Sequence, residues 1–391
     1  MQRQIAAVLA AFAVFWLVGA ASAAELAIGY LELKGDRRYS KSKAEARYLL
    51  RPLGRPYSGA VTAVRELKFP AAAAGVTLKL QREREKSPAA LLEHIAKMRE
   101  AGTRLFVLDL PADAAAHIAR QTRDQDILLF NVSARDDRLR AADCQPHLLH
   151  MIPSLAMEMD ALAQYLAQRK WRDVLLLQGP SEADAAFADR FALSARKYGL
   201  DVVERRPFLL SNDPRERDKN NVTLLTGKDD YDVVFVADSD GEFARDVPYA
   251  TAKPQVVVGA AGLGAVAWHW SWERHGAPQL TKRFRKVAKR PMDSVGWAAW
   301  AAVKAIFAAV QRSGSADYEQ IAARLREPDF ELDVFKGAVA SFRPWDNQLR
   351  QPILLASDIW VIERAPIEGF LHRTNNLDTL GIDKPETRCK F

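Results

Sequence analysis

Polar side chains able to hold a ligand follow directly after a short apolar run in the first half of the chain. The run 127–130 leads into Asn131, Ser133 and Arg135. A continuous apolar run of this length is typical of a buried strand in a parallel sheet, and open α/β sheets bind small ligands just past the carboxyl ends of such strands. The same arrangement follows the runs 105–108, 174–177 and 233–236. We therefore expect several strand ends to form one binding cleft.

Acidic residues are concentrated in these predicted loops, namely Asp109, Asp113, Asp136, Asp137, Asp238, Asp240 and Glu242. Hard cations need several carboxylate oxygens converging from different loops, which makes Asp136, Asp238 and Asp240 candidate metal ligands. The alternative is that the carboxylates cap helices by accepting free backbone N–H groups. Asp113, Asp184 and Glu242 precede or begin predicted helices and suit that role. We expect capping for most of the group.

The sequence lacks the common catalytic motifs. It contains no GxxxxGK[ST] phosphate loop, no HExxH zinc helix and no GxSxG nucleophile turn. The glycine-rich stretch 259–264 follows a predicted strand, but its spacing differs from GxGxxG, so we expect a close turn there. The seven histidines are scattered, which favours exposed or hydrogen-bonded loop histidines over metal ligation. We expect a binding protein without a cofactor, not an enzyme.

Length and the first residues indicate an exported protein of two domains. A chain of 391 residues is long for one core. Residues 1–3 are weakly positive, 5–20 are apolar, and Ala21-Ser22-Ala23 offers small residues for cleavage, so 1–23 is predicted to be a signal peptide. An uncleaved anchor is the alternative. We find no later run long and apolar enough to cross a bilayer, and expect a periplasmic protein.

The formal net charge is +7, but no basic run is interleaved with aromatic residues, so nucleic-acid binding is not expected. Cys144 and Cys389 are the only cysteines. In an oxidising compartment an even pair is a candidate disulfide, and two free thiols are the alternative. Metal binding by the pair is disfavoured because neither has a close partner at CxxC spacing.

Strand-like and helix-like segments alternate through two successive parts of the chain, which is the pattern of doubly wound parallel sheets. The predicted strands are 25–33, 76–82, 105–108, 127–130, 174–177, 202–208, 233–236 and 256–258. The predicted helices include 57–68, 88–100, 153–170, 183–198, 217–226, 278–289 and 294–311. The stretch Trp268–Trp272 between the second part and the last helices is either a lid for a planar or apolar ligand or packing beneath a loop.

With its export segment, two tandem α/β parts and returning C-terminal segment, the chain resembles the type I periplasmic binding proteins, in particular the branched-chain amino-acid receptors of ABC transporters. Several strings look like the subfamily encoded with PQQ-dependent alcohol dehydrogenase systems. These strings are 27–33, 51–60, 129–137, 170–180, 231–249, 267–280 and 342–356.

The resemblance implies two lobes joined by a three-stranded hinge, with a ligand in the cleft between them. Lobe 1 would comprise 25–150 plus 276–328, and lobe 2 would comprise 151–275 plus 329–391 with a C-terminal tail. Carried over to this chain, the ligand-binding positions are Leu110, Pro111, Asn131, Ser133, Arg135, Gln178, Ser181, Asp238, Ser239, Asp240 and Gly262. Amino-acid receptors have small hydroxyl residues in both first-lobe loops, whereas this chain has Leu110-Pro111-Ala112 in one of them, which argues against an amino-acid ligand.

The expected function is therefore a monomeric receptor that delivers a solute to an ABC permease in the inner membrane. The ligand expected from the subfamily is a small molecule or metal chelate linked to PQQ-dependent alcohol oxidation: an alcohol-derived acid, the anionic quinone, or a metal. The alternative is a periplasmic accessory or sensory binding protein of the dehydrogenase system that feeds no transporter.

Overall fold

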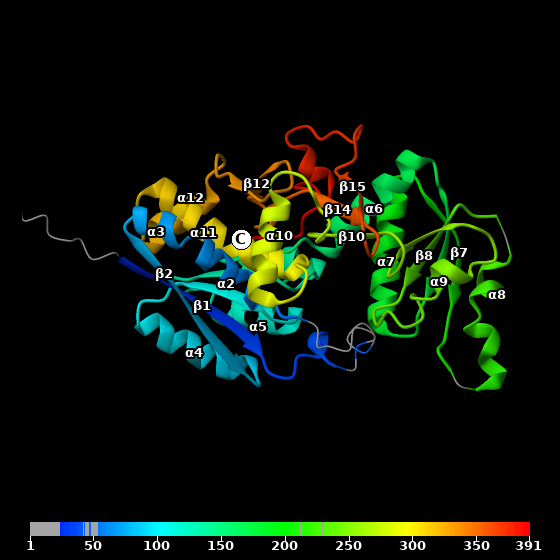
Figure 1. The fold of residues 1–391 in the computed structure, drawn as a ribbon, viewed down its shortest axis with the longest axis horizontal. Coiled ribbons are helices and arrows are strands. Elements are labelled where there is room, and N and C mark those ends of the chain that lie inside the picture. Colours follow the sequence, from blue (N-terminus) through cyan, green and yellow to red (C-terminus); the bar gives the residue numbers. More distant parts are fainter. Residues whose placement is uncertain (1–23, 42, 44–46, 48–53, 212, 229) are drawn as a thin grey trace, which may run out of the picture.

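The protein consists of two α/β lobes that lie side by side along its long axis (Figure 1). The computed structural model describes residues 24–391 apart from 42, 44–46, 48–53, 212 and 229, so the predicted signal peptide lies outside the described residues. Each lobe contains one parallel sheet, in the order β2-β1-β3-β4-β5 in the first and β7-β6-β8-β9 in the second. This confirms the predicted doubly wound α/β fold.

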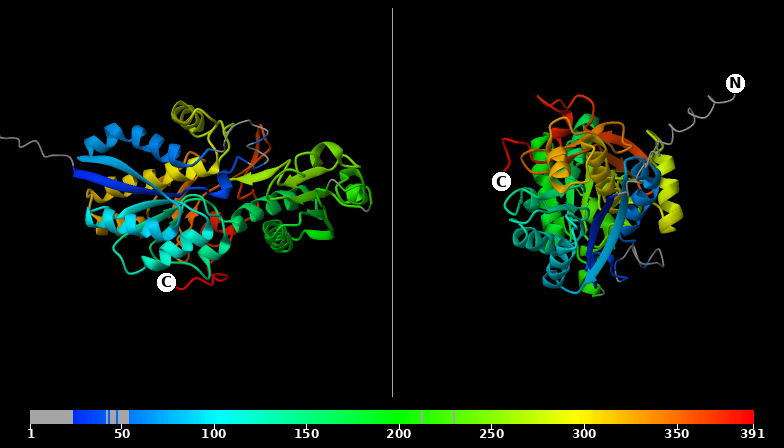
Figure 2. Two further views of the ribbon diagram at one scale, coloured as in Figure 1. Left: turned by 90° about the horizontal axis from the view of Figure 1, so that it is seen from below. Right: turned by 90° about the vertical axis from the view of Figure 1, so that its left-hand side faces the viewer.

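The first-lobe sheet is covered by helices on both faces, as Figure 2 shows. Alternate residues of β3 explain why: Leu105 and Val107 face one core with α2 and α11, while Phe106 and Leu108 face another with α4 and α5. The strands are β1 (Ala24–Leu33), β2 (Val76–Glu85), β3 (Leu105–Asp109), β4 (Leu128–Asn131) and β5 (Leu148–His150). The helices are α2 (Tyr57–Glu66), α3 (Lys68–Ala73), α4 (Pro88–Glu100), α5 (Ala112–Gln121), α10 (Ala277–Ala288), α11 (Ser294–Ser313) and α12 (Tyr318–Arg326).

The second-lobe sheet is also buried on both faces, with Leu176 and Phe235 against α6 and α7, and Leu177 and Val236 on the opposite side. Its strands are β6 (Asp173–Gln178), β7 (Asp201–Pro207), β8 (Val233–Ala237) and β9 (Val256–Gly259). Its helices are α6 (Leu155–Arg169), α7 (Glu182–Lys197), α8 (Val222–Thr226) and α9 (Val247–Ala250). The helix predicted over 217–226 is wrong as one element, because a 3-10 helix, Pro214–Lys219, precedes the short α8.

Short antiparallel strands complete the chain. One sheet has the order β10-β14-β15, formed by Gly264–Val266, Ile353–Ala356 and Val361–Ala365. The other has the order β11-β12-β13, formed by Leu332–Asp333, Val339–Phe342 and Leu349–Arg350. Three further 3-10 helices are η1 (Arg37–Tyr39), η2 (Asp137–Arg140) and η4 (Asn376–Thr379).

Helix α11 corrects one expectation from the sequence. Among the described residues it is long and apolar enough to span a membrane by length and composition, although no such run was expected after the signal peptide. However, 72% of its apolar window is buried inside the protein, and Trp297 and Trp300 are fully buried in the first-lobe core. Its apolar composition therefore serves packing, because a helix surrounded by core has no polar face.

The division of the buried core differs from the predicted lobe ranges. Trp268 and Phe330 belong to the first-lobe core, although both were assigned to lobe 2. Leu349 also packs there, whereas Ile353 packs in the second-lobe core. Burial of these side chains is a long-range property that the local pattern does not contain. We therefore propose that the chain crosses between the lobes near 151–154, 264–267 and 349–352.

Buried polar side chains join the three proposed crossings. The Lys336 ammonium donates hydrogen bonds to Ala267 O at 2.9 Å, Gln351 Oε1 at 2.8 Å and Pro352 O at 2.8 Å. Gln351 Nε2 in turn donates to Met151 O at 2.8 Å. Burial holds the pKa of Lys336 well below its ordinary value. One lysine and one glutamine thus bond to all three crossings.

Gln348 and Arg140 form a second pair of buried side chains, which bonds to the proposed crossing near 151–154. Gln348 Nε2 donates to the carbonyls of His150 and Ile152, each at 3.2 Å. Arg140 donates to Gln348 Oε1 and to Ile152 O, both at 2.9 Å. Burial lowers the pKa of Arg140 to about 10. We refer to Lys336, Gln351, Gln348 and Arg140 as the hinge network.

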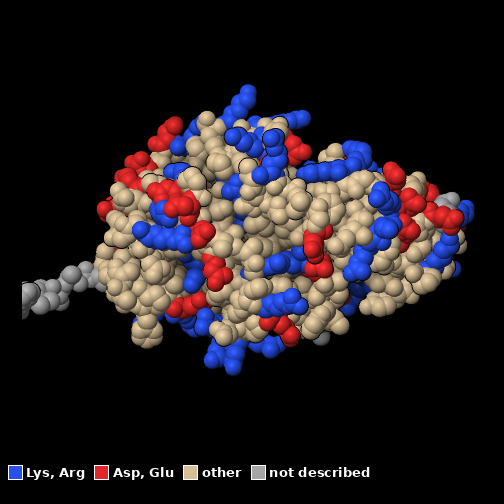
Figure 3. All heavy atoms as spheres, turned by 90° about the horizontal axis from the view of Figure 1, so that it is seen from above, with Lys and Arg blue, Asp and Glu red and all other residues tan. Residues whose placement is uncertain are grey.

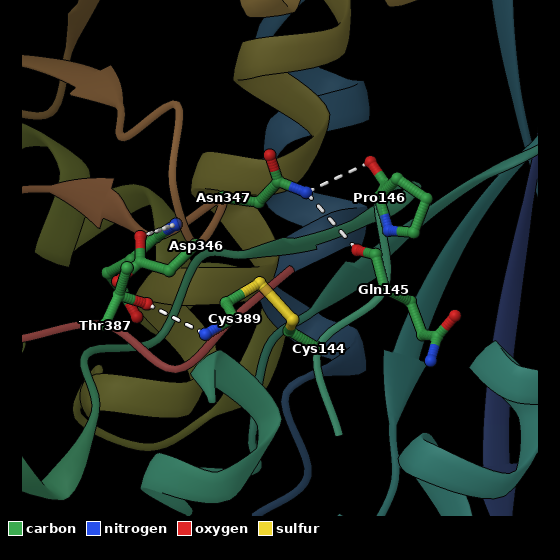
Figure 4. The surroundings of a disulfide bond; sticks show 8 residues. Cys144, Gln145, Pro146, Asp346, Asn347, Thr387 and Cys389 are labelled. Atoms are coloured by element: carbon green, nitrogen blue, oxygen red, sulfur yellow. Dashed lines mark hydrogen bonds between the residues drawn. A yellow bond between two sulfur atoms is a disulfide. The ribbon is translucent and has the colours of Figure 1, made fainter. Parts of the chain in front are cut away.

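The C-terminal tail, residues 376–389, connects the lobes a second time. Cys389 forms a disulfide with Cys144, with the two Cα atoms 5.7 Å apart (Figure 4). The pairing considered from the sequence is thus present in the structure. Beside it, Asn347 Nδ2 donates to Gln145 O and Pro146 O at 3.3 and 3.0 Å. The end of the chain is therefore fixed covalently to the loop that precedes β5.

Candidate binding cleft

Three side chains converge on Asp109, a buried residue at the end of β3. Tyr39 Oη donates to Asp109 Oδ1 at 2.6 Å, and Arg38 Nη2 lies 3.2 Å from the same oxygen. Arg55 Nη1 lies 3.3 Å from Oδ2. Burial raises the pKa of Asp109, while Arg38, Tyr39 and Arg55 oppose this. Both carboxylate oxygens are therefore satisfied within the chain.

Arg38 also contacts the predicted binding residue Ser133. Its Nη1 donates to Ser133 Oγ at 2.9 Å, and its other nitrogens bond to Asp36 at 2.7 to 3.2 Å. The local chain positions the arginine, because Asp36 caps η1 and accepts a hydrogen bond from Arg38 N at 2.9 Å. Arg38 thus contacts both the β3 and the β4 ends of the first lobe.

Asn131, predicted to bind ligand, instead shapes its own loop. Its Oδ1 accepts from the backbone of Ser133 and Ala134, and its Nδ2 donates to Ala134 O at 2.7 Å. The same amide contacts His150 Nδ1 at 3.1 Å, and Asn131 is fully buried. Leu110 is fully buried as well. Of the first-lobe predictions, Ser133 is the polar group closest to this strand-end cluster.

In the second lobe, the carboxylates cap backbone groups. Asp238 accepts from the N–H groups of Asp240, Gly241 and Ala244 at 2.9 to 3.2 Å. Asp184 forms a capping box with Ser181 at the start of α7 and also accepts from Ser239 N. Burial would raise the pKa of Asp184, but the hydrogen bonds from Ser181 and Ser239 outweigh it and lower the pKa. Capping is thus the role that these two carboxylates have.

The remaining predicted ligand-binding residues differ in how far their side chains are exposed to solvent. Gln178 is held by Arg205, and a side chain at Gly262 would meet Val257 O, so Gly262 serves a close turn with φ of +71°. The hydroxyls of Ser181 and Ser239 lie 3.3 Å apart on exposed loops. Pro111 precedes α5 and is partly exposed. The two serines and Asp240 are the exposed polar groups on the second-lobe side.

Ion pairs connect these second-lobe loops to the first lobe. Lys43 Nζ lies 3.1 Å from Asp240 Oδ1 and donates to Ser239 O at 3.4 Å. Arg47 Nη2 lies 2.5 Å from Glu242 Oε2. These four charged side chains are between 32% and 49% exposed. Solvated charges from the segment that follows β1 therefore bridge the first lobe to the loop that follows β8.

Arg135 forms a third cross-lobe pair, with its Nη1 2.8 Å from Glu158 Oε2 on α6. Glu158 is buried, and burial raises its pKa while Arg135 opposes the shift. Arg135 was predicted to bind ligand directly, and it remains largely exposed beside its partner. Because Arg135 belongs to the first lobe and Glu158 to the second, a movement of the lobes would change the distance between the two side chains.

The candidate metal ligands do not converge. Within the described part of the chain, no group of three or more His, Cys, Asp and Glu residues is arranged to hold a metal ion. Asp238 is used by backbone N–H groups and Asp240 by Lys43, while Asp136 lies in the first lobe near Arg138. Figure 3 shows acidic and basic side chains interspersed over one face of the molecule.

Sequence reasoning missed Arg38, Tyr39 and Arg55 as members of this cluster. The signal was present, since Arg37-Arg38-Tyr39 follows the first predicted strand in the same way that the other polar loops follow theirs. The sheet order places β1 directly beside β3, which brings the loop after β1 to Asp109. Strand order is not contained in the local pattern.

Comparison with known proteins gives structural likeness only. No protein-family model matches the chain, and no curated protein matches it. An amino-acid ABC-transporter substrate-binding protein from Pseudomonas fluorescens is 12% identical with a TM-score of 0.68, covering 95% of this chain and 100% of that one. A leucine-, isoleucine-, valine-, threonine- and alanine-binding protein from Brucella ovis, in its closed conformation, is 14% identical with a TM-score of 0.64, covering 85% and 89%.

An ABC-transporter solute-binding protein from R. palustris, in complex with benzoate, is 14% identical with a TM-score of 0.61, covering 94% of this chain and 100% of that one. These solved structures are binding proteins, and each is matched over nearly its whole length. The two parallel-sheet lobes, the strand ends that meet between them and this likeness together show that the chain has the fold of the type I periplasmic binding proteins.

Proposed function

We propose that this protein is a periplasmic solute-binding receptor of an ABC transporter, and that it binds a small ligand between the strand ends by hinge closure. The observation that carries the proposal is the contrast across the cleft. Buried polar groups hold the three crossings together, whereas the ion pairs that bridge the mouth are exposed to solvent. A molecule with one fixed side and one weakly held side suits hinge bending around a ligand.

The first-lobe chemistry favours an anion over a free amino acid. Ser133 is engaged by Arg38, and the loop 110–112 offers no hydroxyl group, so an α-amino group lacks the polar partners that the amino-acid receptors supply. Arg38, Arg55 and Lys43 place three cationic side chains along the first-lobe side. Each is paired with an acidic side chain of the protein, which a ligand carboxylate would displace on binding. Guanidinium groups bind carboxylates well. We propose a carboxylate linked to PQQ-dependent alcohol oxidation: an alcohol-derived acid or the anionic quinone.

The test is a thermal-shift screen of the exported protein, followed by calorimetry. Acetate, glycolate, PQQ, leucine, benzoate, Ca²⁺ and a lanthanide ion form the panel. A ligand at a hundred times its dissociation constant stabilises the folded state by roughly 2.7 kcal/mol. Stabilisation by a carboxylate that is lost in Arg38→Ala and kept in Lys79→Ala, which alters an exposed pair on the first-lobe sheet, supports the proposal. Leucine as the single binder would refute the ligand class while leaving the receptor function intact.

One observation favours a second candidate, an accessory or sensory binding protein of the dehydrogenase system. Arg38 and Tyr39 already occupy the polar groups of the first-lobe strand ends, and Lys43 and Arg47 reach the second lobe. A cleft occupied by the protein's own side chains suits a protein whose partner is another protein. Affinity purification from the periplasm distinguishes the two candidates: recovery of the permease supports transport, and recovery of the dehydrogenase alone supports the accessory function.

A further inference from the structure

A cavity of about 360 Å³ lies away from the strand-end cluster, between α10 and the turn that joins β14 to β15. Helix α10 packs on the first-lobe core through Leu280 and Phe284, whereas β14 packs on the second-lobe core through Ile353. The walls of the cavity therefore come from both lobes. Its lining includes Trp270, Trp272, Thr281, Lys282, Arg285 and Trp360.

The aromatic walls present flat apolar surface to solvent. Trp270 is 43% exposed and Trp360 is 52% exposed. Trp272 is held in place, because its Nε1 donates to Phe335 O at 3.0 Å. By contrast, Trp268 is buried and stacks on Trp297 at 6.4 Å. The aromatic stretch 268–272 is thus divided, with part used for packing and part left facing the cavity, where indole rings can stack on a planar ligand.

Positive charge borders the same aromatic walls. Lys282 and Arg285 are three residues apart on α10 and so lie on one face of the helix. In the described chain, neither is within ion-pair distance of a carboxylate, whereas the neighbouring Arg283 pairs with Glu66 at 3.3 Å. Glu273 is the one acidic residue in the lining, against two basic ones. The lining therefore has a net positive charge of one.

Thr281 adds a polar group without a partner. Its Oγ1 is buried and makes no hydrogen bond within the described residues. A buried hydroxyl without a partner costs free energy, and Thr281 is one of the residues that line the cavity. A bound carboxylate could accept this hydrogen bond together with those of Lys282 and Arg285.

We propose that this cavity is a second ligand site, for a small planar aromatic carboxylate. The ring stacks between Trp270 and Trp360, and the carboxylate pairs with Lys282 and Arg285. A volume of about 360 Å³ is at the lower end of the range for small-molecule sites, roughly 300–1,000 Å³, which suits one or two fused rings. The concave shape favours a small molecule over a flat protein surface. The site is separate from the strand-end cleft of the proposed function.

The position of the site has a consequence for the lobes. Because its walls belong to both lobes, a ligand there binds one lobe arrangement more tightly than another. Such differential binding couples this site to the strand-end cleft, and the coupling is reciprocal. An aromatic carboxylate is therefore expected to change the affinity of the strand-end ligand as well.

The experiment is titration of the full exported protein with naphthalene-2-carboxylate, followed by tryptophan fluorescence and calorimetry. The uncharged naphthalene-2-carboxamide is the matched probe. We expect saturable quenching by the acid, and binding at least about tenfold weaker for the amide. The double variant Lys282→Gln/Arg285→Gln and the variant Trp360→Ala should each weaken binding by at least about tenfold. Lys286→Gln is the matched control, since Lys286 is exposed on α10 but does not line the cavity.

Three results would overturn the proposal. The first is no binding of the acid at about 1 mM, and the second is equal binding of the acid and the amide. The third is a result in which Arg38→Ala loses binding while the α10 double variant binds the acid as tightly as the natural protein. That result would assign the ligand to the strand-end cleft. Circular dichroism and melting temperature of each variant establish that the fold is retained. Because Arg38 and α10 belong to separate sites, failure here leaves the proposed receptor function untouched.

Discussion

The two lobes are held together on opposite sides of the molecule by different kinds of contact. On the hinge side, Lys336 and Gln351 are fully buried and bond to all three proposed crossings. On the cleft side, the side chains of Lys43–Asp240 and Arg47–Glu242 are between 32% and 49% exposed. Exposed pairs contribute about 0–1 kcal/mol each, whereas a buried polar network is costly to disrupt. The contacts that must break during opening are thus the weak ones.

The hinge side also holds the tail in place. Asp378 accepts hydrogen bonds from Arg343 Nε at 2.8 Å and from Arg350 Nε at 2.8 and 2.9 Å. Arg343 precedes the third proposed crossing and Arg350 lies within it, while Leu380 of the tail packs in the second-lobe core. The tail therefore joins the lobes through a buried carboxylate as well as a disulfide.

The largest expected effect follows from Asp378→Ala. This change leaves Arg343, which is 1% exposed, as a buried charge whose strongest acceptor is gone. Loss of one partner of a buried ion pair typically costs about 3–5 kcal/mol. Urea unfolding should show a loss of this size. Asp329→Ala is the control, because Asp329 is 74% exposed beside Arg324 and should cost under about 1 kcal/mol. If both variants lost the same amount of unfolding free energy, the buried pair would contribute no more to stability than the exposed one.

The disulfide should be next in size. Cys144 and Cys389 are 245 residues apart, and the tail before Cys389 is fixed to the second lobe by the hydrogen bond from Gly381 N to Asp160 at 2.8 Å. The double variant Cys144→Ser/Cys389→Ser should lose about 2–4 kcal/mol of unfolding free energy. It should also open more widely in solution, which small-angle scattering would record as a larger radius of gyration. An unchanged radius would show that the tail does not limit opening.

We expect the stability of the protein to depend on pH through His147, which lies close to Cys144 in the chain. Burial, reinforced by Arg326 and Arg123, lowers the pKa of His147 to about 4. The unfolded chain therefore takes up a proton near pH 6.5 while the folded protein does not. Between the two pKa values, the free energy of unfolding rises with pH. Acidification from about pH 6.5 to pH 4 should therefore lower the free energy of unfolding by up to about 3 kcal/mol.

Other groups titrate in this range, so the measurement is a difference between proteins. Unfolding free energies of the natural protein and of His147→Gln should converge or cross as the pH falls, because the variant lacks the proton uptake. The variant can still contact Thr122 Oγ1, which lies 3.0 Å from His147 Nε2. Parallel pH profiles for the two proteins would refute a role for His147.

The fold could be predicted from the sequence because its signals are local. The runs 127–130 and 233–236 largely coincide with β4 and β8, which are buried on both faces. Their continuous hydrophobicity, between helix-like segments, indicates a parallel sheet. The export context suggested the pairing of Cys144 with Cys389. Capping by Asp184 could also be anticipated from its position two residues into a predicted helix.

The cleft could be predicted only in outline. Asn131 and Asp238 lie at strand ends as expected, but their side chains are used by neighbouring backbone groups. The cluster on Asp109 depends on β1 lying beside β3, and the hinge network depends on Lys336 meeting Ala267, 69 residues earlier. These contacts arise from strand order and chain return, which no local pattern specifies. The proposed lobe boundaries depend on long-range packing in the same way.

The smallest effect on stability, and the most informative for function, should come from the cleft side. Asp240→Asn removes the acceptor charge for Lys43 at 3.1 Å while keeping the size of the side chain. Unfolding free energy should change by less than about 1 kcal/mol. The lobes should nevertheless open more often, because even a fraction of a kcal/mol shifts a two-state population.

Single-molecule energy transfer between labels on the two lobes would measure this shift, and added salt should mimic it in the natural protein by screening the exposed pairs. Glu25→Gln provides the matched control, since Glu25 pairs with Lys79 at 3.0 Å with similar exposure but within the first lobe. Glu25→Gln should change the unfolding free energy by as little as Asp240→Asn does, and it should leave the distance between the lobes unaltered. If the control variant opens the lobes as much as Asp240→Asn, the ion pairs at the mouth do not hold the cleft.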